Sequence, residues 1–337
     1  MATPRPLDVR PLDCTSPADL ELAYVLERDG ELAAVGRSDA TLDSVTSILC
    51  GPHGWRDQHA VVYDGGTPVG LLAAELIQPG REVFLDAFAV GDRIPEVLRL
   101  LLQRGLDAAT VMAADDDEAS SDVADPYAMS ADFWQVTAAA YTVDQAYITE
   151  IEALGFRPIR RFWRMFCDLD GAPSADPQAP PGVTRRVVAS EDDERLLHRL
   201  FHESFSEHFG HTVEESFESW VGRVRAHAGN REDGWWIAEL DGEPVGLCIV
   251  DDSKDEFNEG YVRTLGVLSE ARGRGVAKWL LGCAAADARR RGRTGIGLAV
   301  DGQNTTGATA LYESVGYIIR QELDVYCYPL VDSALSR

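Results

Sequence analysis

Three pairs of similar segments recur in the same order along the 337 residues of this chain. In the first pair, TPVGLL and EPVGLC both follow an Asp-Gly dipeptide, which favours a tight hairpin turn between apolar stretches. The paired segments are Thr67–Leu72 with Glu243–Cys248, Val83–Val90 with Gly260–Val267, and Ile148–Ile159 with Thr309–Arg320. Three ordered matches predict two copies of one α/β unit of about 160 residues each.

A segment rich in proline and alanine, GAPSADPQAPPG at Gly171–Gly182, separates the two copies. This composition is typical of a linker between domains. A chain of 337 residues also exceeds one ordinary domain core. We therefore predict a first domain over residues 1–170, a linker over residues 171–182 and a second domain over residues 183–337.

The composition, 45% hydrophobic and 26% charged, is that of a soluble globular protein. The six cysteines form no Cys-x-x-Cys pair and no Cys/His spacing, so we expect neither a zinc site nor a disulfide framework. The first residues, MATPRPLDVRPLD, lack the apolar core of a secretion signal, and no stretch approaches the roughly 18 apolar residues of a membrane span. We therefore expect a cytoplasmic protein.

A formal net charge of −25 argues against nucleic acid or an anionic membrane surface as a partner, since both would be repelled. The same charge permits a small cationic molecule as a ligand. A solvated acidic surface that keeps the protein in solution is the more common explanation of such a charge. The sequence does not indicate an oligomeric state.

The stretch Tyr261–Ala277, YVRTLGVLSEARGRGVA, begins with the composition of a strand and passes through an Arg/Gly cluster into a helical pattern. Unpaired backbone N–H groups and the helix dipole make such a helix start a site for phosphate. A P-loop is disfavoured because Lys278 follows Ala277 instead of Gly and precedes Trp279 instead of Ser or Thr. A dinucleotide fingerprint is disfavoured because its third glycine is missing.

Two blocks of this half resemble the GNAT superfamily of N-acetyltransferases. Arg272–Ala277 has the spacing of that family's acyl-coenzyme A loop, which is Gln or Arg, two residues, Gly, one residue, and Gly or Ala. About 35 residues downstream, Asn304 and the segment ATALYESVGY resemble the family's Asn, then Ala-x-x-x-Tyr-x-x-x-Gly-Phe signature. The resemblance covers roughly Gly234–Pro329, and a tandem arrangement is also found in mycothiol synthase and its relatives.

The resemblance implies two tandem domains, each a twisted mixed β-sheet flanked by helices, and acetyl-CoA as acyl donor without a metal. It implies that the strand before the loop splays from its neighbour and that its free backbone groups hold the acetyl and pantetheine portions. Tyr312 matches the residue that donates a proton to the CoA sulfur. The positions implied to contact the cofactor are Leu265, Gly266, Val267, Arg272, Gly273, Arg274, Gly275, Val276, Ala277 and Asn304.

A primary amine that attacks a thioester must first lose a proton, which calls for a general base. Glu259, at the start of the predicted central strand, is our candidate, and Glu256 lies just before it. Carboxylates near strand ends are more often surface residues. The histidines of HESFSEHFGH, at 202, 208 and 211, alternate with phenylalanines and indicate helix packing more than a metal site.

The first copy lacks the features that carry this chemistry. Gly91–Glu96 has no glycine pair, and its Asp92 and Glu96 would repel a pyrophosphate. Aligning Gly155 with Gly316 places Ile151 opposite Tyr312. We therefore predict one acetyl-CoA per chain, bound by the second copy.

The sequence thus predicts an acetyl-CoA-dependent N-acetyltransferase that modifies a primary amine of a small, cationic acceptor by direct attack. One alternative is a non-catalytic acyl-CoA-binding regulatory protein, which Tyr312 disfavours. Another is a scaffold built on two degenerate copies, which the intact loop of the second copy disfavours. The acceptor itself is not identified by the sequence.

Overall fold

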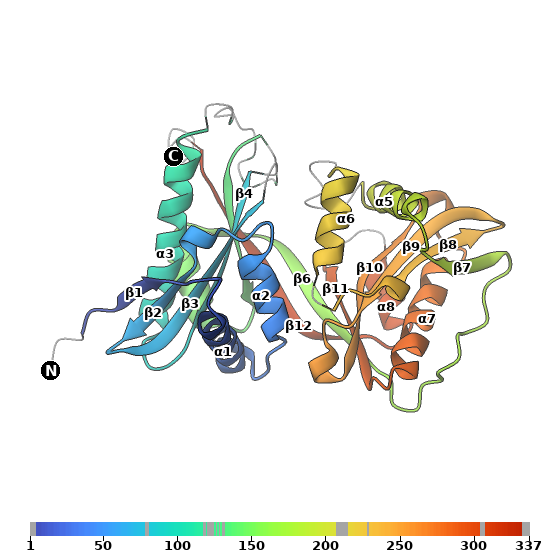
Figure 1. The fold of residues 1–337 in the computed structure, drawn as a ribbon, viewed down its shortest axis with the longest axis horizontal. Helices are drawn as coiled ribbons and strands as arrows, with labels where there is room; N and C mark the ends of the chain where they lie inside the picture. Colours follow the sequence, from blue (N-terminus) through green and yellow to red (C-terminus); the bar gives the residue numbers. More distant parts are fainter. Residues whose placement is uncertain are drawn as a thin grey trace. The chain divides into compact units, whose positions relative to one another are not determined.

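The computed structural model describes residues 5–77, 81–116, 119, 125, 127, 129, 132–206, 215–227, 229–303 and 307–331. Two compact units emerge from the contacts within the chain (Figure 1). Unit 1 comprises Met1–Arg161 with Leu323–Arg337, and unit 2 comprises Phe162–Glu322. In the described part of the chain, no helix is long and apolar enough to cross a membrane.

The sheet of unit 1 has the strand order β1-β2-β3-β4-β5-β12, and its β4–β5 pair is parallel. Alternate side chains of β4 are buried, because successive side chains of a strand point to opposite faces of the sheet and one face of β4 is covered more fully than the other. The strands are β1 (Asp8–Pro11), β2 (Ala60–Asp64), β3 (Thr67–Ile77), β4 (Glu82–Ala89), β5 (Gln135–Tyr141) and β12 (Ile318–Pro329).

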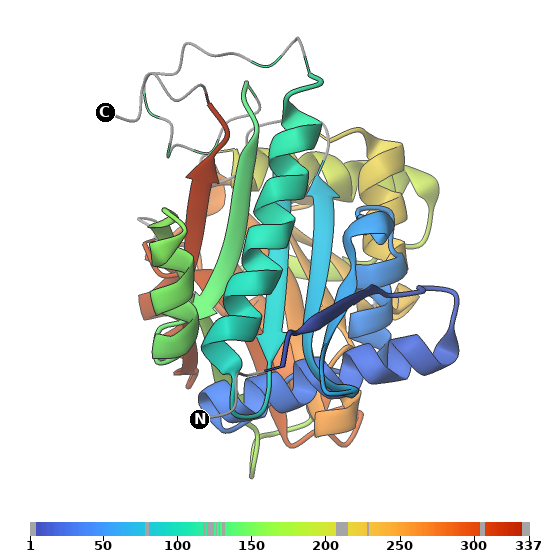
Figure 2. The same cartoon turned by 90° about the vertical axis from the view of Figure 1, so that its left-hand side faces the viewer.

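Helices cover both faces of this sheet. The helices α1 (Pro17–Val35) and α2 (Leu42–Cys50) share a core with one face, and α3 (Ile94–Ala113) and α4 (Gln145–Ala153) share a core with the other. Figure 2 shows α3 lying along the strands of this sheet. The start of α1 follows from Ser16, whose side chain accepts a hydrogen bond from the Asp19 backbone N–H.

Unit 2 repeats this plan, with the strand order β6-β11-β10-β9-β8-β7 and a parallel β10–β11 pair. One face carries α5 (Glu191–Phe205) and α6 (Phe217–Ala226), and the other carries α7 (Val276–Arg290) and α8 (Ala308–Glu313). The strands are β6 (Arg157–Asp168), β7 (Val183–Val187), β8 (Trp235–Leu240), β9 (Glu243–Asp251), β10 (Glu259–Val267) and β11 (Gly295–Asp301). The predicted fold class, two α/β units with mixed sheets flanked by helices, is confirmed.

Each unit takes the last strand of its sheet from the other half of the sequence. In unit 1, Leu323–Pro329 of β12 pairs antiparallel with β5, and in unit 2, Phe162–Asp168 of β6 pairs antiparallel with β11. The structure therefore divides the chain after Arg161 and again after Glu322, whereas the sequence suggested one division at Gly171–Gly182. The difference arises because strand pairing places residues by hydrogen bonding and not by their order in the chain.

The segment 171–182, named the strap here, packs along α7 within unit 2. The Trp279 indole N–H donates to the Pro177 carbonyl oxygen at 2.9 Å. A side chain at Gly282 would clash with Pro177, because a Cβ there would lie 2.7 Å from the Pro177 ring. Near the start of α7, a Cβ at Gly275 would lie 3.3 Å from Pro180. The proline-rich composition thus belongs to a packed segment and not to a free linker.

Candidate functional site

An opening between two parallel strands forms the centre of the site in unit 2. The β10–β11 ladder pairs Glu259–Val262 with Gly295–Leu298, although β10 continues to Val267 and β11 to Asp301. Beyond Val262 the two strands separate, while β10 stays paired with β9 as far as Val267. The edge of β10 that faces the opening therefore presents backbone N–H and C=O groups to a ligand.

The chain leaves β10 through a short 3₁₀ turn, Ser269–Ala271, and enters α7 through a glycine-rich loop. Gly273 and Gly275 have φ angles of 75° and 82°, a left-handed conformation that glycine adopts without steric cost. Gly275 caps α7 without a side-chain hydrogen bond, so no side chain occupies the first amide groups of the helix. Those amides and the helix dipole favour an anion at this point.

A pocket of about 760 Å³ joins the opening to the loop. Most of the predicted cofactor residues line it: Leu265, Gly266, Val267, Arg272, Gly273, Gly275, Val276 and Ala277. Arg274 is exposed and is not part of the lining. Asn304 lies outside the described residues, so its predicted contact stays a prediction.

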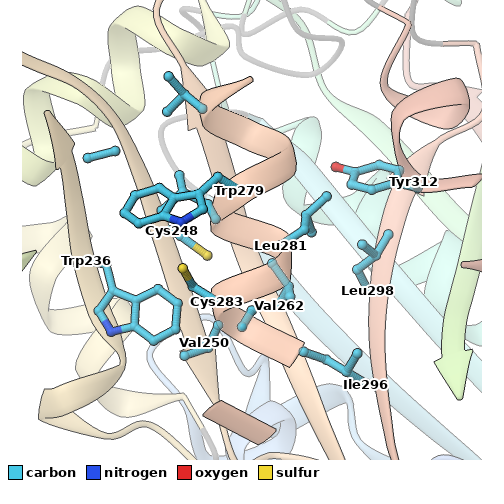
Figure 3. Close-up of a cluster of buried hydrophobic side chains, with 14 of the residues drawn as sticks. Trp236, Cys248, Val250, Val262, Trp279, Leu281, Cys283, Ile296, Leu298 and Tyr312 are labelled. Atoms are coloured by element: carbon cyan, nitrogen blue, oxygen red, sulfur yellow. The ribbon is translucent and has the colours of Figure 1, made fainter. Parts of the chain in front are cut away.

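Tyr312 lines the same pocket from α8, and its side chain is buried with 8% of its surface exposed. Figure 3 shows its hydroxyl oxygen pointing to the side on which α7 carries Trp279 and Leu281. Burial, with a smaller effect of the nearby Cys248, raises the pKa of Tyr312 to about 12. The hydroxyl is therefore protonated at neutral pH and is able to donate a proton.

Glu259 is not brought to this pocket. It stands at the first residue of β10, and its carboxylate accepts a hydrogen bond at 2.8 Å from the Arg320 guanidinium. The Arg320 guanidinium also stacks over the Phe166 ring, 3.3 Å from the ring centre. The structure thus places Glu259 in a partly buried ion pair, while its role as a base stays a prediction.

Gly266 makes room for a neighbouring helix. A Cβ on this residue would lie 2.8 Å from both the Leu247 side chain and the Ser204 Cβ. Ser204 belongs to α5 and lines the pocket together with Phe201 and Phe205, which the sequence reasoning did not select. Their alternation with histidines indicated helix packing, and that packing brings this helix to the site.

Asp301 is another lining residue that the sequence reasoning missed. It ends β11, is 6% exposed, and its Oδ1 accepts a hydrogen bond from the Gln303 backbone N–H at 2.9 Å. The signal that could have found it is its position at the carboxyl end of a parallel strand, where ligands bind in open α/β sheets.

The other reactive side chains among the described residues of unit 2 include two buried thiols and a pair of histidines. Cys248 and Cys283 turn their sulfur atoms toward one another beneath α7 (Figure 3), and burial raises the pKa of Cys283 to about 11. His202 is buried, and its Nε2 lies 2.9 Å from Nε2 of His198. His208 and His211 lie outside the described residues, among which no group of three or more His, Cys, Asp or Glu could hold a metal ion.

Comparison with known proteins links this geometry to one family. Residues 195–317 match the family model described as "Acetyltransferase (GNAT) family". The chain is 27% identical over 188 residues to a mycothiol acetyltransferase of Cellulomonas flavigena. That alignment spans 52% of each protein, so the chain matches about half the length of this curated relative.

Two solved structures share the fold over nearly the whole chain. A GCN5-related N-acetyltransferase from Sphaerobacter thermophilus superposes with a TM-score of 0.77 at 23% identity, and the match covers 96% of both chains. A tandem GNAT protein from the clavulanic acid biosynthesis pathway superposes with a TM-score of 0.70 at 17% identity, covering 96% of this chain and 99% of that one. At these identities the likeness establishes the fold alone.

Proposed function

We propose that this chain, a tandem-domain member of the GNAT family, transfers an acetyl group from acetyl-CoA to a primary amine. One observation carries the proposal: a single pocket of unit 2 contains both the glycine-rich start of α7 and the buried hydroxyl of Tyr312. The start of α7 suits the phosphates of the donor. The hydroxyl suits protonation of the donor's sulfur atom when it leaves the acetyl group. A binding protein would need the first feature and not the second.

The residues present fit an acyl-CoA thioester. Two left-handed glycines and the unoccupied amides at the start of α7 suit a pyrophosphate, and the exposed Arg272 and Lys278 add positive charge beside them. The free edge of β10 at Leu265–Val267 offers backbone hydrogen bonds to an extended chain that carries amide groups. When bound, acetyl-CoA would supply the activated acetyl group.

Tyr312 would act as the general acid in this reaction. A thiolate that leaves the acetyl group gains a negative charge, and a positioned hydroxyl neutralises that charge by giving up its proton. With a pKa of about 12 the hydroxyl is protonated at neutral pH, so it has a proton to give when the sulfur leaves. The amine would attack the acetyl group directly, because the thiols of Cys248 and Cys283 are protonated at neutral pH and unsuited to hold an acyl group.

The experiment is a CoA-release assay on the full-length protein with acetyl-CoA and a panel of primary amines, which includes diamines, amino sugars and amino acid amides. We expect release of CoA thiol that depends on at least one amine of the panel. Isothermal titration calorimetry with acetyl-CoA runs in parallel. Binding of acetyl-CoA without release by any amine would contradict the proposal and favour a regulatory acyl-CoA-binding protein.

A further inference from the structure

The strap contacts α7 from the last turn of the helix to its glycine-rich start, and Figure 1 shows the chain passing beside α7 on its way to β7. At the last turn, the Arg290 guanidinium donates to the Asp176 carboxylate at 2.8 Å. Pro177 lies against the middle of the helix, at Gly282, and Pro180 lies against its start. The strap therefore runs antiparallel to α7 and ends beside the loop.

A tight turn fixes the end of the strap that lies nearest the loop. The carbonyl oxygen of Pro180 accepts a hydrogen bond from the Val183 backbone N–H at 3.0 Å. Between them stand Pro181 and Gly182, and Gly182 has a φ of 75°. Proline at the second position and a left-handed glycine at the third are typical of a type II turn. Because Val183 is the first residue of β7, the sheet of unit 2 holds Pro180 in place.

Two contacts of the strap reach the part of α7 that carries the candidate phosphate site. A Cβ built on Gly275 would lie 3.3 Å from Cγ of Pro180, which is not part of the pocket lining, whereas Gly275 lines the pocket. One turn further along α7, the Trp279 indole N–H donates to the carbonyl oxygen of Pro177 at 2.9 Å. Because packed interiors leave few voids, a shift of the strap displaces the loop backbone.

We propose that the strap positions the loop at the start of α7 for acetyl-CoA, so that affinity for the donor depends on two prolines outside the pocket. This inference rests on the proposed function, because it concerns the donor part of the same pocket. Pro177 and Pro180 are then positioning residues. They keep the first amides of α7 directed at the pyrophosphate, and hydrogen bonds to those amides weaken when their lengths or angles change.

The closing experiment displaces the strap of the full-length protein from a point outside the pocket lining. Gly282 lies about two helical turns after Gly275, and a Cβ there would lie 2.7 Å from Cγ of Pro177. Gly282→Ala therefore pushes the strap, although alanine favours a helix more than glycine does. Gly222→Ala is the matched control, because Gly222 belongs to α6 and a Cβ built there has no atom within 4 Å.

Two further variants act on the strap itself. Pro177→Ala removes Cγ and Cδ but keeps Cβ, which lies 3.7 Å from the Cβ built on Gly282, an ordinary contact distance. It also keeps the carbonyl that accepts the Trp279 indole N–H. The double variant Gly282→Ala/Pro177→Ala thus relieves the clash and serves as the rescue. Pro180→Ala removes the ring atom nearest to Gly275 and tests the contact at the loop directly.

We expect Gly282→Ala and Pro180→Ala to weaken acetyl-CoA binding by about 3- to 30-fold in titration calorimetry, the range for changes that act through packed neighbours. KM for acetyl-CoA should rise by a similar factor. Turnover at saturating acetyl-CoA should stay within about twofold, because Tyr312 belongs to α8 and its hydroxyl is unchanged. Gly222→Ala should match the wild type, and the double variant should recover most of the affinity.

Three results would overturn the inference in distinguishable ways. If the wild type binds no acetyl-CoA, the proposed function is wrong and the inference falls with it. If the wild type binds acetyl-CoA and both Gly282→Ala and Pro180→Ala bind it as tightly as Gly222→Ala, the inference alone is wrong. If Gly282→Ala binds weakly and Pro177→Ala does not restore the affinity, the loss arises within α7 and the strap has no positioning role.

Discussion

In both units the two parallel strands separate at the corresponding position, but the residues beside the opening differ. In unit 1 the parallel β4–β5 ladder also stops after four residue pairs, at Leu85 and Ala138. Three residues beyond Ala138, the hydroxyl of Tyr141 donates to the Glu31 carboxylate of α1 at 2.6 Å. In unit 2 the residue at the matching position is Asp301, which lines a pocket. In unit 1 the polar residue at this position bonds to a helix, and in unit 2 the corresponding residue lines the pocket.

The helix starts differ in the same sense. In unit 1, α3 begins after Arg93, whose guanidinium bonds to Glu96 at 2.9 Å and to Asp64 at 3.3 Å. In unit 2, α7 begins after Gly275, which has no side chain to place over the first amides. The first turn of α3 also carries the carboxylate of Glu96, which would repel a phosphate, whereas the first turn of α7 carries no acidic residue. The comparison teaches that the shared fold provides the opening and that a few residues decide whether a ligand fits it.

The largest expected difference between the units is in acetyl-CoA stoichiometry, with one site in unit 2 and none in unit 1. Calorimetric titration of the full-length protein should therefore give a stoichiometry near one. A value near two would mean that unit 1 binds the donor despite the carboxylate of Glu96 in the first turn of α3. The Gly275→Asp variant separates the cases, because a site in unit 1 would survive this change.

Tyr312→Phe should lower turnover by about 10²- to 10⁴-fold, the range for loss of a positioned general acid. The affinity for acetyl-CoA should be retained, because the aromatic ring stays. The matched control is Tyr147→Phe, which removes a buried tyrosine hydroxyl from α4, the corresponding helix of unit 1. If Tyr312→Phe and Tyr147→Phe have equal turnover, the Tyr312 hydroxyl is not the general acid and the residue serves in packing.

Gly275→Asp should weaken acetyl-CoA binding by about 10²-fold or more, because it places a carboxylate beside the phosphate site and strains a left-handed backbone. Gly91→Asp is the control in unit 1, since Gly91 has a φ of 87° and no atom within 4 Å of a built Cβ. Both variants place the same charge on a left-handed backbone, and a Cβ at Gly275 also approaches Pro180 at 3.3 Å. Calorimetry compares the acetyl-CoA affinity of the two variants. Equal affinities would refute the loop assignment.

The smallest expected effect is on stability in mild acid. Burial, followed by the charges of Arg263 and Arg223, lowers the pKa of His227 in unit 2 to about 4, below the ordinary value of 6.5. The unfolded state therefore binds more protons between these values, and unit 2 should lose at most about 1.4 kcal/mol of stability per pH unit as the pH falls from 6.5 to 4.

Unit 1 should respond less to the same acid. Burial lowers the pKa of His59, but it raises the pKa values of Glu75 and Glu82, which bind protons more readily in the folded state. These opposite contributions partly cancel. Hydrogen exchange followed by mass spectrometry at pH 6.5 and 5 measures each unit, and His227→Gln should reduce the pH dependence of unit 2. If the stability of unit 2 depends on pH equally in His227→Gln and the wild type, other titrating groups cause the dependence.

Local patterns predicted much of this molecule. The repeat identified the matching strands β3 and β9, and the Arg/Gly spacing identified the loop at α7. These features are encoded in contiguous residues, whose period and turn chemistry depend on near neighbours. Tyr312 was identifiable because its spacing from the loop is also a property of the chain itself.

What depends on distant residues was not predicted. Glu259 forms an ion pair with Arg320, which lies 61 residues away in the sequence, and no local pattern indicates this pair. The strap has the composition of a linker, but Gly275 and Gly282 on α7 leave space for its prolines. This fit between the prolines of the strap and the glycines of α7 depends on the folded positions of both segments, so neither segment alone predicts it.

The exchange of last strands has a consequence for how the protein is made. The ribosome completes Gln135–Tyr141 of β5 long before it adds Leu323–Pro329, the part of β12 that pairs with this strand. At about 5–20 residues per second, the intervening stretch takes roughly 10–40 s to synthesise. During that interval β5 has an unpaired edge, which is a site for aggregation or chaperone binding. The unit that is translated first is therefore the unit that folds to completion last.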